Sequence, residues 1–283
     1  MSVDYVIADC LEWLPTLPDN SVDLIIADPP YYKIKSDEWD NQWRTFEEYL
    51  TWLENVAIEL RRVLKNNGSL YMFGDDHRIA YIQVMLDKHF TFLNHLVWYK
   101  RNNMCIKYAH NNRKYAPVSE RILFYSLQDA TGLERVMLDV DNFQTLRQYF
   151  KEFQEALGIS LKQINSTLGH RKAEHAFYWN STQWDLPTPE TYAELCKLPL
   201  KSEFIRREYG DLRREYEDLR RPFNYEKGMY EVFDIPIINS RENTAHPTTK
   251  PSEIIRQLIL NSSNPDALIL DPFLGSGTTL RAC

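Results

Sequence analysis

One apolar run near the amino end of the chain leads directly into a carboxylate, two prolines and two tyrosines. The run Val22–Ala27 is rich in β-branched and apolar residues, which favours a strand buried on both faces. Proline cannot continue the hydrogen bonding of a strand, so this strand is expected to end near Asp28. Because open α/β sheets bind ligands at the carboxyl ends of their strands, Asp28, Pro29, Pro30 and Tyr31 are candidates to bind a flat polar ring that carries an amino group. The alternative is a turn whose tyrosines belong to the core.

A glycine-rich turn near the other end of the chain is the second motif that could bind a ligand. Residues 271–279 read Asp-Pro-Phe-Leu-Gly-Ser-Gly-Thr-Thr and follow a buried-strand pattern at residues 267–270. Such a turn lets the backbone approach a ligand closely and offers the amides of a helix start to an anion. A Gly-x-Gly pattern alone is a weak signal, but the preceding strand and a cationic segment upstream strengthen it.

That cationic segment, residues 100–116, contains lysines and arginines but no aspartate or glutamate, and asparagines and tyrosines lie between the cations. Cations bind phosphates, amides read base edges and aromatic rings stack on bases, so the segment is a candidate nucleic-acid loop. The candidate contacts are Lys100, Arg101, Asn102, Lys107, Arg113 and Lys114. A solvated loop is an equally good interpretation of these residues taken alone.

The composition is that of a soluble globular protein. The 283 residues are 43% hydrophobic, with mixed charge, no apolar run of membrane length and no recognisable signal peptide. Cys10, Cys105, Cys196 and Cys283 lack the paired spacing of a zinc site or a redox motif. The net charge of −7 excludes a uniformly basic nucleic-acid coat but leaves room for a local basic groove. We therefore expect a cytoplasmic protein with reduced cysteines and no metal.

Strands alternate with helices along the first part of the chain, which predicts a largely parallel α/β sheet with helices on both faces. Strands are expected at residues 3–8, 22–27, 69–73, 92–99 and 120–126, the last as a hairpin partner. Helices are expected at residues 45–64, stopped by the Asn-Asn-Gly of 66–68, and at residues 79–86. Near the carboxyl end, the pattern predicts an apolar segment at 235–238, a helix at 252–260 and a strand at 267–270.

The interior of the chain reads as a mainly helical insertion. Helices are expected at residues 143–157 and 161–168, the second capped by Ser160, and each is stopped by a glycine. The pair resembles half of a helix-turn-helix DNA reader with residues 170–179 as its recognition element, but the aromatic residues there suit a core as well. Two near-copies at 207–220, REYGDLR and REYEDLR, place apolar residues on one stripe of a helix, for packing within the insertion or, second, for dimerisation.

Three segments together resemble the amino-methyltransferases that modify exocyclic amines of DNA bases. They are Asp28-Pro29-Pro30-Tyr31, His246-Pro247-Thr248-Thr249-Lys250-Pro251 and Asp271-Pro272-Phe273-Leu274-Gly275-Ser276-Gly277. The catalytic motif comes first and the glycine turn last, which resembles the permuted class β. The resemblance implies a Rossmann-like, S-adenosylmethionine-dependent methyltransferase sheet in circularly permuted order. It also implies a catalytic half at residues 1–126, a target-recognition insertion at 127–235 and a cofactor-binding half at 236–283.

The resemblance further implies roles for the site residues. Asp28 and the Pro29 carbonyl would accept the two hydrogens of the amine and expose its lone pair, and Tyr31 would stack on a base flipped from the duplex. Lys250, Thr248 and His246 would bind the carboxylate of the cofactor, and Asp9 with Cys10 its adenine ring. The residues expected to hold S-adenosylmethionine are Asp9, Cys10, His246, Thr248, Lys250, Asp271, Phe273, Gly275, Ser276, Gly277 and Thr278.

The chain departs from the family pattern after the glycine turn. The family continues into a strand whose acid, about 20 residues beyond the glycines, holds the ribose hydroxyls. This chain stops at Cys283. The sequence therefore predicts a truncated reading frame, or a partner that supplies the missing strand, and deficient cofactor binding by residues 1–283.

The implied activity is site-specific methylation of adenine N6 in duplex DNA. An aspartate rather than a serine before the two prolines favours adenine, and methylation of cytosine N4 is the first alternative. Methylation of RNA or of a protein amide is a second enzymatic alternative, and a DNA-binding subunit with incomplete catalysis is the alternative from another class. Double-stranded DNA in a bacterial or phage-infected cytoplasm is the expected partner, and a homodimer and a restriction endonuclease are left open as further partners.

Overall fold

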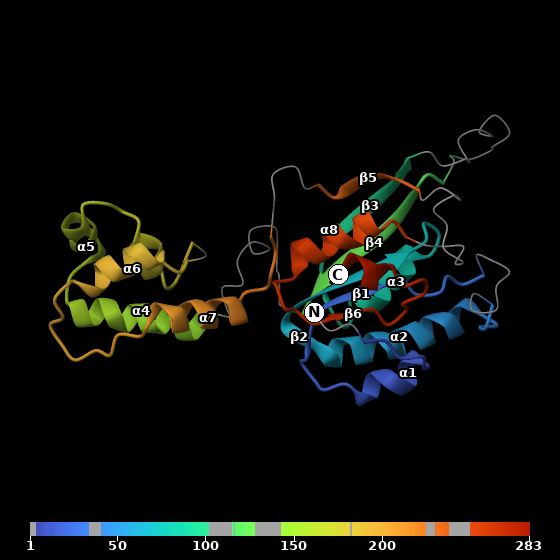
Figure 1. Ribbon diagram of the computed structural model, residues 1–283, viewed down its shortest axis with the longest axis horizontal. Helices are drawn as coiled ribbons and strands as arrows, with labels where there is room; N and C mark the ends of the chain where they lie inside the picture. Colours follow the sequence, from blue (N-terminus) through green and yellow to red (C-terminus); the bar gives the residue numbers. More distant parts are fainter. Residues whose placement is uncertain are drawn as a thin grey trace. The chain divides into compact units, whose positions relative to one another are not determined.

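The computed structural model describes residues 4–33, 41–101, 115, 117–127, 143–181, 183–224, 230–237 and 250–283 (Figure 1). The chain divides into two compact units. We call residues 1–129 with 222–283 the sheet unit and residues 130–221 the helical unit. In the ranges that the structure describes, no helix is both long and apolar enough to cross a membrane.

A six-stranded mixed sheet with the order β5-β3-β4-β2-β1-β6 forms the centre of the sheet unit (Figure 1). β1 pairs in parallel with β2 and β6, β3 pairs in parallel with β5, and β4 runs antiparallel between β2 and β3. The amino end of β4 therefore lies at the same edge as the carboxyl ends of the other strands. The strands are β1 Val22–Ala27, β2 Leu64–Gly74, β3 Thr91–Arg101, β4 Ser119–Ser126, β5 Val232–Pro236 and β6 Ile269–Leu270.

Helices cover both faces of this sheet, as the sequence predicts. On one face, side chains of β1, β2 and β4 form a core with α2 and α3. On the other face, side chains of the same strands and of β3 and β5 form a second core with α8. The helical elements of the sheet unit are α1 Cys10–Trp13, the 3₁₀ turn η1 Leu14–Thr16, α2 Phe46–Val63, α3 Ile79–Leu86, α8 Ser252–Ser262 and α9 Thr278–Ala282.

The strand β1 has the bounds that the sequence predicts and is buried on both faces. Its apolar residues are at most 2% exposed. The one polar residue of the strand, Asp23, binds the ammonium of Lys65 at 2.7 Å and the amide of Leu268 at 2.9 Å. β1 is therefore fixed from both sides, which holds the motif that follows it in place.

The junction between α2 and β2 differs from the prediction. The helix ends at Val63 and β2 begins at Leu64, before the Asn-Asn-Gly sequence at residues 66–68. The pairing register of β1 with β2 shifts here, so that Val22 faces Leu64 while Leu24 faces Ser69. A Cβ at Gly68 would lie 2.9 Å from the Lys65 carbonyl oxygen. The glycine thus serves a close backbone approach within the irregular start of a strand rather than the end of a helix.

Two predicted strands are corrected by the structure. Residues 4–8 form neither strand nor helix, and Tyr5, Val6 and Ile7 are 70%, 58% and 94% exposed. In the described sheet no strand pairs with these apolar residues, and β6 is the last strand on the β1 side. The strand expected at residues 267–270 is shorter and consists of Ile269–Leu270 alone.

The helical unit has its own aromatic core, in which Phe150, Phe153 and Leu212 are fully buried. Its first two helices end at Gly158 and Gly169 in left-handed conformation, as predicted. The segment after Gly169 is not a recognition helix, because Ala176 and Phe177 are buried in the core, and the core interpretation is the correct one. The elements are α4 Gln144–Leu157, α5 Leu161–Leu168, the 3₁₀ helix η5 Glu174–Phe177, α6 Pro189–Cys196 and α7 Tyr209–Leu219.

The repeated sequence at 207–220 forms α7, and its apolar stripe packs within the helical unit. Leu212 is fully buried, and Tyr209, Tyr216 and Leu219 pack against the same core. The structure therefore uses the stripe for internal packing. Residues 222–235, which the sequence predicts to be part of the insertion, lie in the sheet unit, since β5 pairs with β3.

Candidate active site

The acid of the first motif lies immediately beyond β1. Asp28 follows the last residue of the strand, at the carboxyl edge of the sheet. The hydroxyl of Tyr31 donates a hydrogen bond to its Oδ1 at 3.1 Å. The two prolines between them thus turn the chain back, so that the first and last residues of the predicted motif meet.

The ammonium of Lys250 binds both oxygens of Asp28. Its Nζ lies 2.9 Å from Oδ1 and 2.7 Å from Oδ2, although the two residues are 222 positions apart. Lys250 is 7% exposed, and its Nζ lies 5.2 Å from the ring centre of Tyr31 and 5.4 Å from that of Phe73. A buried ammonium is costly unless it is paired, so this contact ties the segment before α8 to the end of β1.

A second carboxylate faces the same ammonium. Glu120 is the second residue of β4, and its Oε2 lies 3.5 Å from the Nζ of Lys250. Its other oxygen, Oε1, forms an ion pair with Lys100 of β3. We call Asp28, Lys250, Glu120 and Lys100 the charge chain, since acid and base alternate along it and the formal charges cancel.

Burial and charge act in opposite directions on these groups. Burial alone would lower the pKa of Lys250, but the carboxylates of Asp28 and Glu120 outweigh it, and the pKa is raised. Burial opposes the charge of Glu120 as well, but Lys250 and Lys100 lower its pKa below the ordinary value. Burial and the charges of Asp28 and Glu120 raise the pKa of Tyr31 well above its usual value. Lys250 and Glu120 are therefore charged at neutral pH, and Tyr31 is neutral.

The contacts of Asp28 leave room for one further hydrogen bond. An ionised carboxylate offers about four acceptor positions. Within the described residues Lys250 occupies one position on each oxygen, and Tyr31 occupies a second position on Oδ1. The remaining position, on Oδ2, suits a hydrogen donor such as an amine.

The glycine turn connects β6 to α9 at the same edge of the sheet. Gly275 and Gly277 have φ of +51° and +75°, a region that side chains other than glycine rarely adopt. The Asp271 carboxylate orders the turn, because it accepts the Phe273 amide at 2.9 Å and the Thr279 hydroxyl at 2.5 Å.

Asp271 is an acid without a cationic partner among the described residues. Burial raises its pKa to about 6, the Thr279 and Phe273 hydrogen bonds counteract that effect in part, and the charge of Asp28 adds to it. Because β1 and β6 are parallel neighbours, the two acids lie at the same edge. A buried carboxyl that is destabilised as an anion suits a cationic ligand, which would supply the missing positive charge.

Aromatic side chains of α2 connect the two motifs. The ring of Tyr32, which follows the motif of residues 28–31, lies 6.0 Å from that of Tyr49. Tyr49 lies 5.9 Å from Trp52, and Trp52 lies 5.8 Å from Phe273 in the glycine turn. One helix face thus positions both sides of the candidate site.

Two predicted cofactor contacts have a structural role of their own. The carboxylate of Asp9 caps α1, since its Oδ1 accepts the amide of Leu11 at 2.8 Å. Cys10 is a free thiol that packs against the core formed in part by α2, and burial raises its pKa to about 11. Their predicted contact with an adenine ring stays a prediction.

The predicted DNA contacts that the structure describes are engaged in ion pairs. Lys100 belongs to the charge chain. Arg101 binds Asp234 of β5 twice: its Nε donates to the carboxylate at 2.9 Å, and its Nη2 donates to the backbone carbonyl at 2.7 Å. The predicted site residues outside the described ranges are Asn102, Lys107, Arg113, Lys114, His246 and Thr248.

The sequence predicts Glu120 as a residue of the sheet framework and does not indicate its part in the site. The available signal was the predicted hairpin. A strand that returns antiparallel places its first residues beside the carboxyl end of its neighbour, and Arg121 does pair with Gly74, the last residue of β2. A glutamate at the start of such a strand therefore faces the ligand edge.

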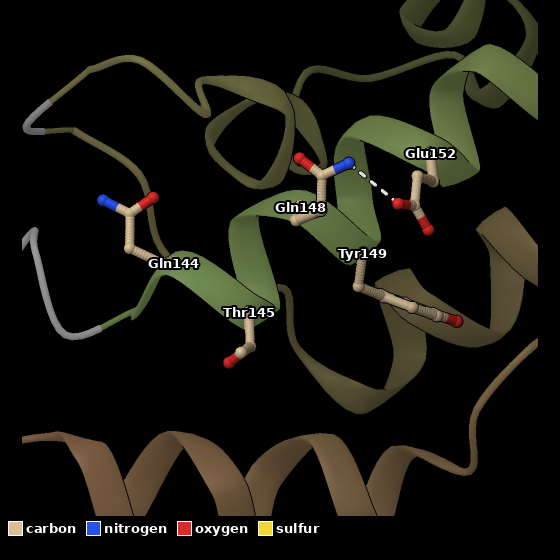
Figure 2. A pocket seen from close by; sticks show the side chains of 5 residues that line it. All are labelled: Gln144, Thr145, Gln148, Tyr149 and Glu152. Carbon is tan, nitrogen blue, oxygen red and sulfur yellow. Dashed lines mark hydrogen bonds between the residues drawn. The ribbon is translucent and has the colours of Figure 1, made fainter.

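Among the described residues, no group of three or more His, Cys, Asp or Glu side chains is arranged to hold a metal ion. On the helical unit, a hollow of about 430 Å³ lies along α4 (Figure 2). Figure 2 shows Gln148 bonded to Glu152, at 2.7 Å, along the wall of the hollow. The residues that line it are Gln144, Thr145, Gln148, Tyr149 and Glu152.

Comparison with known proteins finds one family along most of the chain. The N6/N4 methyltransferase model, described as DNA methylase, matches residues 22–283. The DNA adenine methyltransferase YhdJ of Escherichia coli K12 is 26% identical over 276 residues, which are 96% of this chain and 71% of that protein. The type II methyltransferases M.BglII of Bacillus subtilis and M.HinfI of Haemophilus influenzae are 24% and 26% identical over 96% of this chain. The chain spans only 59% and 58% of their lengths.

Solved structures of the same kind share the fold at low identity. The complex of M1.HpyAVI with SAM has a TM-score of 0.50 at 19% identity and covers 98% of this chain and 84% of that chain. The cytosine-N4-specific PvuII DNA methyltransferase has a TM-score of 0.52 at 15% identity, with 98% and 76% covered.

Proposed function

The chain belongs to the N6/N4 DNA methylase family, and on that premise we propose that it transfers a methyl group from S-adenosylmethionine to the N6 amine of an adenine in duplex DNA. The observation that carries the proposal is the proximity of Asp28 and Asp271 beyond the paired strands β1 and β6. One acid belongs to the amine-binding motif and the other to the glycine turn. Methyl acceptor and methyl donor would therefore be bound at one edge of the sheet.

The chemistry required on the acceptor side is orientation of a poor nucleophile. The lone pair of a base amine is delocalised into the ring, so the nitrogen must become pyramidal before it can attack. We propose that Asp28 and the carbonyl of Pro29 accept the two amine hydrogens and that Lys250 holds the Asp28 carboxylate in the required orientation. Correct positioning of the two reactants supplies most of the rate in such a step.

The base must leave the duplex to reach this site, since its amine is inaccessible within the stack. Tyr31 is the residue that we propose to stack on the flipped base. Its hydroxyl is already fixed on Asp28 at 3.1 Å, so the ring has a defined orientation before a base arrives.

S-adenosylmethionine fits the other side of the site. When bound, it supplies an electrophilic methyl group on a sulfonium cation. We propose that Asp271 and residues 273–278 hold it, because the turn is open at Gly277. Among the described residues, an added Cβ there would meet only the Leu280 side chain, at 3.7 Å. The sequence assigns Lys250 to the carboxylate of this cofactor, whereas its contacts with Asp28 support a role on the acceptor side.

Replacing Asp28 tests the proposal. We expect Asp28→Asn to lower methyl transfer to duplex DNA by at least about 100-fold. The substitution removes the negative charge that orients the amine and that pairs with Lys250. Transfer is measured by digesting the treated DNA to nucleosides and quantifying N6-methyladenine. The matched control is Glu54→Gln, which removes a partly exposed acid paired with Lys88 and should leave transfer unchanged.

Three outcomes would contradict the proposal. N4-methylcytosine in the digest would replace adenine by cytosine as the substrate. Transfer to RNA without transfer to duplex DNA would reject the nucleic acid that we name. Unchanged transfer by the Asp28→Asn variant would reject the role of Asp28.

A restriction endonuclease is the partner that the relatives suggest, since two of them are named type II methyltransferases. We propose that this protein likewise protects a defined DNA sequence. Single-molecule sequencing of DNA from cells that express the gene would give the modified base and the surrounding sequence in one experiment.

A further inference from the structure

We propose that Glu120 is a positioning residue of the methyl-transfer site, which holds the ammonium of Lys250 against Asp28 and is itself held by Lys100. The inference rests on the proposed function for its effect on catalysis. Its structural part, the placement of Lys250 by Glu120, can be measured without any enzymatic turnover.

The charge chain joins four separate segments of the sheet unit. Asp28 follows β1, Lys250 precedes α8, Glu120 lies in β4 and Lys100 lies in β3. The side chains of Lys250, Glu120 and Lys100 are 8%, 16% and 20% exposed. Charges this far from water interact strongly, and each of them needs its partners.

A packing role alone does not account for Glu120. An apolar side chain could fill the same space without the cost of burying a carboxylate. Its Oε2 is buried and accepts no hydrogen bond of ordinary geometry from the described residues, yet it faces the Lys250 ammonium at 3.5 Å. The carboxylate thus acts on Lys250 through its charge, while Lys100 binds the other oxygen.

The placement of Lys250 bears directly on Asp28. Lys250 contacts both oxygens of Asp28, so a shift of the ammonium would rotate the carboxylate and move its remaining acceptor position. Asp28 attracts the ammonium from one side and Glu120 from the other. The groups that face Lys250 are Asp28, Tyr31, Glu120 and the ring of Phe73.

The test is the substitution Glu120→Gln, which keeps the shape and removes the charge. We expect kcat to fall by about 10- to 100-fold with little change in KM, because substrates still bind but the amine is held in the wrong place. The alkaline limb of the pH–rate profile should move to lower pH, since Glu120 is one of the two acids that raise the pKa of Lys250. The control Glu54→Gln should change neither kcat nor the profile.

A second measurement is independent of activity. NMR titration of protein labelled at the lysine ε-carbon, with Lys250 identified by its loss in Lys250→Met, should show Lys250 titrating at lower pH in Glu120→Gln. Should that variant fold poorly, Glu120→Asp, which keeps the charge, should restore both folding and the titration of Lys250.

The results separate the inference from the proposed function. If Lys250 titrates at lower pH in Glu120→Gln but the protein methylates no nucleic acid, the placement of Lys250 by Glu120 is supported and the proposed function is rejected. If Lys250 titrates at the same pH in Glu120→Gln as in the unsubstituted protein, and the pH–rate profile is unchanged, the inference is overturned. Equal loss of kcat in the Glu54→Gln control would overturn it as well.

Discussion

Two acids at one edge of the sheet have opposite surroundings. Asp28 is bound by the ammonium of Lys250 and by the Tyr31 hydroxyl. Asp271 receives an amide and a hydroxyl hydrogen bond, and burial raises its pKa to about 6. The charge of Asp28 is therefore already balanced by a lysine, whereas the anionic form of Asp271 would be stabilised by a cation. This asymmetry agrees with an amine at Asp28 and a sulfonium near Asp271.

The asymmetry predicts a pH-dependent preference for the charged cofactor. Asp271 becomes an anion as the pH rises through about 6, so its attraction for a sulfonium increases over the same range. Binding of S-adenosylmethionine should tighten by about fivefold between pH 5 and pH 8 for a coupling of roughly one pKa unit. Titration calorimetry at several pH values measures this change.

One control ligand and one variant show whether the attraction between Asp271 and the sulfonium causes this pH dependence. S-adenosylhomocysteine has a neutral sulfur and should bind with little change across pH 6. Asp271→Asn should remove the pH dependence for S-adenosylmethionine. Equal pH dependence for both ligands would show that another group causes it.

At the scale of elements, the sequence predicts those segments whose own residue pattern determines their secondary structure. The sequence predicts β1 and α2, because a strand buried on both faces and an amphipathic helix are visible in composition and spacing. The segment at residues 4–8 has the composition of a strand, but a strand forms only where a neighbour pairs with it, and composition does not contain that information.

The candidate site follows the same rule. Asp28 and the glycine turn are local motifs, and both could be found from the sequence. The contact of Glu120 with Lys100 follows from the hairpin of β3 and β4, which the sequence predicts. The contacts of Lys250 with Asp28 and Glu120 join segments far apart in the sequence, and no local pattern specifies them. The charge chain as a whole is therefore visible only in three dimensions.

The capping of α5 gives a prediction at this scale. Ser160 and Gln163 form a reciprocal capping box, with the Ser160 amide 2.8 Å from the Gln163 side chain. Ser160→Ala should destabilise the helix by about 1 kcal/mol. Amide hydrogen exchange along α5 should therefore become roughly fivefold faster.

The control for this prediction lies in the same helix. Ser166 is exposed in the middle of α5, where alanine is a better helix former. Ser166→Ala should leave exchange unchanged or slow it slightly. Faster exchange in both variants would mean that the cap has no special importance.

At the scale of the whole molecule, the chain brings two distant motifs to one site. The acceptor motif lies near the start of the sequence and the glycine turn near its end, yet β1 and β6 are neighbours. The helical unit is inserted between them in sequence and folds around its own core. Motif order along the chain is therefore independent of the arrangement that the chemistry needs.

Net charge is the other property of the whole molecule that bears on function. A chain with a charge of −7 can bind DNA only where cations are concentrated and not already neutralised. In residues 100–116, Lys100 and Arg101 are bound to Glu120 and Asp234. Lys107, Arg113 and Lys114 of the same segment lie outside the described residues, and the sequence makes them candidates for phosphate contacts.

The dependence of DNA binding on salt tests this assignment. Each phosphate contact contributes about 0.9 to the slope of log K against log salt concentration. The triple variant Lys107→Ala, Arg113→Ala, Lys114→Ala should therefore lower the slope by about 3. Arg101→Ala should change it little, because that guanidinium is bound to Asp234. Fluorescence anisotropy with a labelled duplex between roughly 50 and 200 mM salt measures the slope, and an unchanged slope in the triple variant would assign the phosphate contacts to another part of the molecule.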